Sequence, residues 1–102
     1  MKSSLPVRFH PRVQLDLDHA LKYYSDISQR LGNDFWAEFQ SALEKIQRGP
    51  ERFHIDTSSR LRRFNLEQFP YNIFYRIYED RIRIHVVRHN QRNPSFGLRR
   101  NQ

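Results

Sequence analysis

Arginine side chains in the second half of the chain are the residues best suited to chemistry. Residues 52–102 contain eleven basic and four acidic side chains, whereas residues 1–51 contain seven of each. From Arg81 onward there are six arginines and no acid, and only three of the 18 cations are lysines. A guanidinium binds phosphate or carboxylate through two parallel hydrogen bonds. The pattern therefore predicts a polyanionic partner, either nucleic acid or an acidic protein segment.

Catalytic and metal-binding motifs are sparse. The five histidines include no H-E-x-x-H motif and no pair four residues apart on a predicted helix, so we expect no metal site. His85 and His89 fall on one predicted strand about 13 Å apart, which is too far for both to act on one atom. The absence of cysteine excludes thiolate chemistry. No P-loop, G-x-S-x-G or G-x-G-x-x-G motif is present, and we expect no cofactor.

Two helices are predicted in the first half. Apolar residues at three- and four-residue steps predict a helix over residues 12–31, with Gly32 directly after its end. A second helix, with Asn33 or Asp34 as its N-cap, is predicted to end at the Gly49-Pro50 pair. Because the connection between them is short, these helices are expected to form an antiparallel hairpin.

The remaining elements are predicted strands. Residues 5–10 alternate between apolar and polar side chains and contain a proline, which indicates a short edge strand. Three further strands are predicted over residues 61–67, 71–78 and 82–88, the last two as a hairpin. Without a bulge, one sheet face would carry a mixture of cations, imidazoles and aromatic rings: Arg63, Asn65, Glu67, Asn72, Phe74, Arg76, Tyr78, Arg83, His85, Val87 and His89. This mixture fits a nucleic-acid-binding face, and it fits equally a solvated face with a second small core around Phe74 and Val87.

Together these elements predict a single α+β domain over residues 1–102, with an N-terminal strand, an antiparallel helical hairpin and a three-stranded antiparallel sheet. We expect the tail to fray from about residue 99. No apolar run reaches the roughly 20 residues that span a bilayer, and the first residues lack the apolar segment of a secretory signal. A cysteine-free chain suits a reducing compartment. We therefore expect a cytoplasmic protein with no membrane partner.

The chain resembles the RelE/ParE superfamily of toxins from bacterial type II toxin–antitoxin modules in three segments: VRFHP, RGPERF and LRRFNLEQFPYNIFYRIYEDRIRIHVVRHNQRNP. The most specific part is residues 69–77 followed by residues 82–94. The long helical hairpin and the HNQRNP ending are closer to the ParE-like branch. The resemblance implies the fold derived above and a toxin that is neutralised by a cognate antitoxin.

The ParE-like branch implies growth inhibition by binding, with DNA gyrase as the target and no hydrolytic site. The alternatives are a RelE-like, ribosome-dependent mRNA endonuclease and an inactive toxin-like interaction module. In a nuclease, Arg88 or Arg92 would stabilise the charge of the phosphorane and His89 would act as acid or base. Two departures count against the nuclease: Asn72 stands where the family often has an arginine, and the last strand lacks the final tyrosine of many nucleases.

Two kinds of contact surface are expected for the antitoxin or the target. The outer grooves of the helical hairpin would accept apolar anchors, and the basic side chains would accept acids. The basic contact residues expected from the sequence are Arg62, Arg63, Arg76, Arg83, Arg88, His89, Arg92, Arg99 and Arg100.

Overall fold

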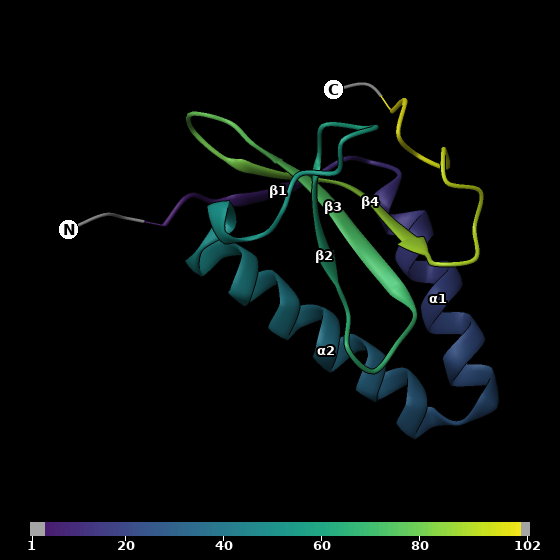
Figure 1. Cartoon of the computed structure of the whole chain (residues 1–102). Helices are drawn as coiled ribbons and strands as arrows, with labels where there is room; N and C mark the ends of the chain where they lie inside the picture. Colours follow the sequence, from purple (N-terminus) through teal and green to yellow (C-terminus); the bar gives the residue numbers. More distant parts are fainter. Residues whose placement is uncertain (1–3, 101–102) are drawn as a thin grey trace.

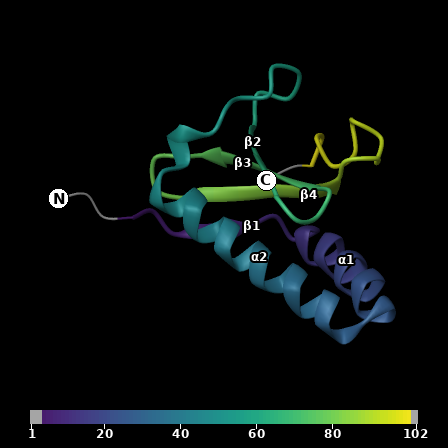
Figure 2. The ribbon, with the colours of Figure 1, turned by 60° about the horizontal axis from the view of Figure 1, so that its bottom comes forward.

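The computed structural model describes residues 4–100, which form two long helices, one short 3-10 helix and four strands (Figure 1). In chain order these elements are β1 (Val7–Phe9), α1 (Val13–Ile27), α2 (Gln29–Arg48), η1 (Pro50–Arg52), β2 (Arg62–Asn65), β3 (Tyr71–Ile77) and β4 (Ile82–His89). The sheet order is β1-β4-β3-β2. Both long helices cover one side of the sheet, whereas the loop before β2 and the C-terminal tail lie on the other side (Figure 2).

The α+β class and the edge position of the N-terminal strand are confirmed. β1 pairs in parallel with β4, so the three predicted antiparallel strands become a mixed sheet of four. Parallel pairing requires a long crossover connection between the two strands. The helical hairpin is part of that connection, which explains why it packs against the sheet.

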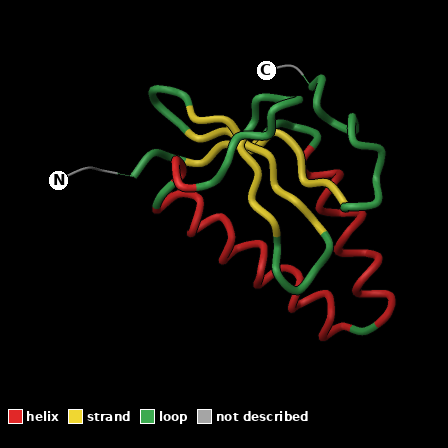
Figure 3. Tube along the Cα trace, viewed as in Figure 1, coloured by secondary structure: helices red, strands yellow, loops and turns green. Residues whose placement is uncertain are grey.

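The break between the helices lies at Ser28, earlier than predicted. Ser28 has extended backbone, and its Oγ accepts a hydrogen bond from the Leu31 N–H at 3.0 Å, as an N-cap does. Gly32 is buried inside α2, where an added Cβ would lie 2.1 Å from Oγ of Ser25 in α1. The prediction that Gly32 ends the first helix was therefore wrong, because this glycine allows a close helix–helix approach. Figure 3 shows the short non-helical segment at the break.

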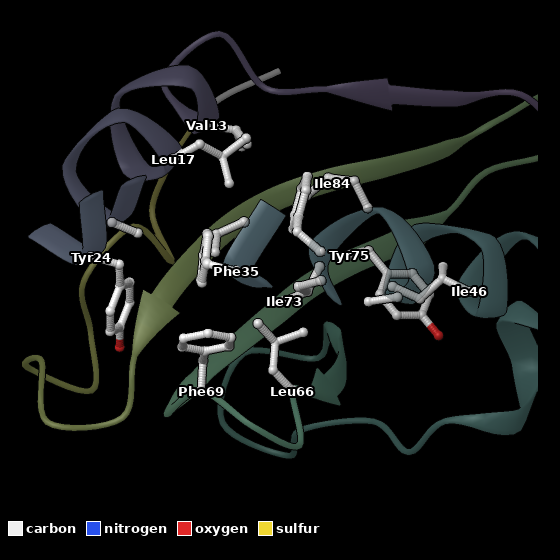
Figure 4. Packing of buried hydrophobic residues seen from close by; sticks show 14 of the residues in the cluster. Val13, Leu17, Tyr24, Phe35, Ile46, Leu66, Phe69, Ile73, Tyr75 and Ile84 are labelled. Carbon is white, nitrogen blue, oxygen red and sulfur yellow. The ribbon is translucent and has the colours of Figure 1, made fainter. Parts of the chain in front are cut away.

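The main core fills the space between the helices and the sheet (Figure 4). Phe35, Phe39 and Ile46 project from α2 and are fully buried against Ile73 and other apolar residues of the central strands. Aromatic contacts connect this core to α1, because Tyr24 stacks on Phe35 with ring centroids 5.5 Å apart. Large buried rings supply much of the apolar area in so small a domain. The sheet face toward the helices is thus committed to packing.

A β-bulge at His85 changes which residues share a sheet face. Tyr75 pairs with Ile84 while Phe74 pairs with Val86, so His85 is the extra residue on β4. The bulge turns Val87 toward the helices and Val86 toward the opposite face. We call the sheet face opposite the helices the open face. The prediction that Val87 lies on this face assumed a strand without a bulge, and it was therefore wrong. The second small core exists, with Val86 in the place predicted for Val87.

The C-terminal tail covers this second core. Phe96 and Leu98 pack on the buried cluster of Leu61, Phe74 and Val86. Gly97 has φ +77°, and an added Cβ would lie 2.5 Å from a methyl carbon of Val86. Glycine is required at such a position because it combines left-handed backbone with close contact. The tail therefore lies directly on the sheet up to this residue.

Candidate functional site

The face of the sheet opposite the helices brings several predicted contact residues together. Arg76 and Arg83 are directly opposed in the β3–β4 register. They line a cavity of about 210 Å³ together with Ser59, Tyr78 and His85. Like charges directly opposed across strands are unfavourable. The arrangement concentrates positive charge on this face, which suits an acidic or phosphate-bearing partner.

Of the three residues considered for nuclease chemistry, Arg88 and His89 lie on opposite faces of β4. Arg88 lies on the open face, with its guanidinium 4.4 Å from the centroid of the Phe74 ring and a hydrogen bond to the Pro94 carbonyl. Burial lowers the pKa of Arg88, while Asp56 raises it and Arg63 lowers it. His89 points to the helix side of the sheet, where its ring centroid lies 5.0 Å from that of Tyr71. Neighbouring strand residues face opposite sides of a sheet, so the side chains of Arg88 and His89 point away from each other at the end of β4.

Other predicted contact residues hold the fold together. An Nη atom of Arg62 donates to the Phe53 carbonyl at 2.7 Å. The Arg92 guanidinium lies 4.1 Å from the centroid of the Phe96 ring, where it packs on the tail. Arg99 is exposed on the surface. The positive charge of the second half is thus divided between internal contacts and the open face.

Arg100 forms an ion pair that sequence reasoning missed. Its two Nη atoms donate to the two carboxylate oxygens of Asp16, both at 2.8 Å, and one also donates to the His85 carbonyl at 3.1 Å. The side chains of Asp16 and Arg100 are only 4% and 8% exposed. Asp16 also accepts the Val87 N–H at 3.0 Å. Arg100 is therefore attached to α1, although fraying was expected from about residue 99; residues 101–102 lie outside the described range.

One local signal could have indicated this pair. Asp16 falls on the apolar stripe of α1, between Val13 and Ala20, where a carboxylate must be buried. A buried charge requires a partner. The sequence offers many arginines, however, and nothing local identifies Arg100 as the one that reaches it.

His85 is a histidine on the open face whose pKa is lowered by burial. Its Nε2 lies 3.3 Å from the Leu98 carbonyl, and its ring lies 5.9 Å from that of His10. Burial lowers the pKa of His85 below 6.5, the hydrogen bond to Leu98 raises it, and the charges of His10, Arg100 and Arg83 lower it. His85 is therefore neutral in the folded protein at neutral pH.

The lowered pKa of His85 predicts a stability that depends on pH. Below pH 6.5 the unfolded chain binds a proton at this position more readily than the folded chain, so the free energy of unfolding falls as pH falls. Above pH 6.5 the contribution of His85 to the free energy of unfolding is fully present. Between pH 7 and pH 5.5, we expect the free energy of urea unfolding to fall less in His85→Asn than in the wild type. Equal profiles for His85→Asn and the wild type would contradict the assignment.

An apolar groove lies on the other side of the molecule, where β1 meets the two long helices. It has a volume of about 330 Å³, and its apolar lining residues are Phe9, Val13, Leu17, Trp36, Phe39 and Leu43. The Phe9 and Trp36 side chains are 45% and 42% exposed, so large apolar surfaces face solvent there. Exposed aromatic clusters of this kind are typical of protein-binding sites. We name this feature the hairpin groove.

The fold and these surfaces define a class of small α+β domain, in which a helical hairpin packs on a four-stranded sheet with a basic open face. The same architecture occurs in a chain of the chromosomal ParDE TA system from P. aeruginosa, with a TM-score of 0.73 and 16% sequence identity. That match covers 84% of this chain and 96% of the other. It establishes the fold.

Residues 7–94 match the family model of the ParE toxin of the type II toxin–antitoxin system parDE. The chain belongs to this ParE toxin family. A search of curated proteins gave no match. Across residues 4–100, no three side chains of the metal-binding types come together, and no helix in this range is long and apolar enough to cross a membrane.

Proposed function

We propose that this ParE-family toxin inhibits growth by binding DNA gyrase in the cytoplasm and is neutralised by a cognate antitoxin. Family membership supports the toxin role. The observation that favours binding over RNA cleavage is the opposite orientation of Arg88 and His89 across β4. Cleavage by general acid–base chemistry needs both groups within reach of one scissile phosphodiester. A surface of fixed cations without such a pair is suited to holding a partner.

Induced expression in a bacterial host tests this function. Growth should stop, co-expression of the antitoxin should restore it, and cells should show the DNA damage that stalled gyrase causes. Primer extension on translated messages distinguishes the nuclease alternative. Cleavage at the ribosomal A site would reject the proposal, and continued growth at full expression would instead support an inactive interaction module.

The hairpin groove is the proposed site for the apolar anchors of the antitoxin. Trp36 has a large exposed ring that also contacts the buried Phe39 ring, at a centroid distance of 5.8 Å. Rings of this kind dominate binding energy at protein interfaces. We expect Trp36→Ala to weaken antitoxin binding by about 30-fold or more, as measured by titration calorimetry. Tyr23→Ala removes an exposed ring outside the groove and should change the affinity little, so equal losses would contradict this assignment.

The open face is the proposed site for antitoxin acids. Arg63 and Arg76 lie on this face, on neighbouring strands. Attraction between exposed charges weakens as salt screens it. The variant Arg63→Glu/Arg76→Glu is therefore expected to weaken antitoxin binding strongly at 50 mM salt and less at 500 mM. An affinity that is unchanged at low salt would exclude these residues from the interface.

A further inference from the structure

A second groove, which has no lining residue in common with the hairpin groove, lies between the end of α2, η1 and β2. Its volume is about 720 Å³. Four cations and two aromatic rings line it: Lys45, Arg48, Arg52 and Arg63, with Phe53 and Phe64. Glu67 is its acidic lining residue. We name this feature the α2–β2 groove.

The groove is preformed, because three hydrogen bonds fix its outer wall to the sheet. The hydroxyl of Tyr75 donates to the Pro50 carbonyl at 2.6 Å, and burial raises the pKa of Tyr75 to about 12. Arg62 donates to the Phe53 carbonyl at 2.7 Å, and the Arg63 N–H donates to the His54 carbonyl at 3.1 Å. A ligand therefore finds its site without ordering a loop, which reduces the entropic cost of binding.

The positive charge of the α2–β2 groove exceeds what the fold requires. The carboxyl end of a helix carries about half a negative charge, which Lys45 and Arg48 in the last turn of α2 more than offset. Arg52 in η1 and Arg63 in β2 add further charge. Within residues 4–100, no ion pair with a carboxylate involves any of the four cations. The groove thus presents a concentrated positive field to a multiply charged anion.

Aromatic surface accompanies these cations. Phe53 and Phe64 pack edge to face with centroids 4.8 Å apart, and both are only half-buried. The Arg52 guanidinium lies 5.9 Å from the centroid of the Phe53 ring. Proteins that hold single-stranded nucleic acid combine a cationic groove for the backbone with ring faces on which bases stack. Both parts are present here within one groove.

A peptide strand is a poorer occupant, because the edge of β2 is already used. The loop before β2 forms an antiparallel bridge between Ile55 and Arg62, and His54 accepts the outward N–H of Arg63. A peptide that extends a sheet needs such backbone groups to be free. A nucleic acid strand needs only the side chains. We propose that the α2–β2 groove binds single-stranded nucleic acid, with phosphates on its cations and a base against Phe53.

Fluorescence anisotropy with labelled dT12 and rU12 tests this proposal on the full chain. The Arg48→Glu/Arg52→Glu variant changes two exposed side chains and should bind at least about tenfold more weakly. Its plot of log affinity against log salt should be shallower by about 1.4, because each lost phosphate contact removes about 0.7. Phe53→Ala should weaken binding by about fivefold or more without changing this slope.

The Lys22→Glu/Arg30→Glu variant is the matched control, since it makes the same charge change at helix positions that are 77% and 91% exposed. It should retain more than half of the wild-type affinity. Binding of either oligonucleotide through Arg48 and Arg52 supports the proposal. The oligonucleotide that binds more tightly shows whether the groove prefers DNA or RNA. Equal losses in both charge variants, or capture of an acidic peptide but of neither oligonucleotide, would overturn it. Circular dichroism checks that each variant is folded.

Discussion

Arg100→Ala is expected to lower the free energy of unfolding by about 3–5 kcal/mol, because it strands the buried carboxylate of Asp16. Asp16 is fixed on α1 and keeps only the Val87 N–H as a partner after the change. The same substitution releases the tail from the second core, which it covers through Phe96 and Leu98. We therefore expect the loss of this one ion pair to loosen the tail on the second core.

Urea unfolding measures this effect, and a double-mutant cycle isolates it. Asp16→Ala should lower the free energy of unfolding less than Arg100→Ala does. When Asp16 is removed, Arg100 lies on a tail that can move its charge into water. The double variant should cost less than the sum of the two single changes, since the pair is in direct contact. Arg99→Ala changes an exposed neighbour and should stay within about 0.5 kcal/mol of the wild type. A loss below about 1 kcal/mol for Arg100→Ala would show that the pair does not hold the tail.

Phe39→Ala is expected to lower the free energy of unfolding by about 3–5 kcal/mol, because it leaves a cavity between α2 and the sheet. The Phe39 side chain is 1% exposed and belongs to the main core. The surrounding residues are fixed on separate elements and cannot collapse fully into the space. Thermal or urea unfolding gives the value.

Tyr23→Ala is the comparison for this core change, since it removes a ring that is 61% exposed on α1. Its effect should be much smaller than that of Phe39→Ala. A loss below about 1 kcal/mol in Phe39→Ala would mean that the apolar stripe of α2 is not the face that packs on the sheet.

Local patterns predicted the elements of this fold well. Helical periodicity, the Gly49-Pro50 stop and the existence of three strands after residue 61 all depend on neighbouring residues, and the structure confirms them. The exact helix break was wrong because Gly32 and Ser28 are both plausible boundaries locally. The contact of Gly32 with Ser25 across the hairpin decides between them.

The candidate site was harder to predict, because it depends on register and on contacts between distant residues. The bulge at His85 places Arg88 and His89 on opposite faces from those that strict alternation predicts. The Asp16–Arg100 pair joins residues from opposite ends of the chain. The α2–β2 groove combines residues from α2, η1 and β2. The basic half of the sequence pointed to an anionic partner, but only the fold shows which arginines remain available to it.

The most direct test of the proposed function is a supercoiling assay with purified gyrase. We expect the protein to inhibit supercoiling and to trap cleaved DNA, and we expect an equimolar amount of the cognate antitoxin to restore the activity. The Arg100→Ala protein, if it remains folded, shows whether gyrase inhibition needs the attached tail. Full gyrase activity at a large molar excess of the wild-type protein would contradict the account.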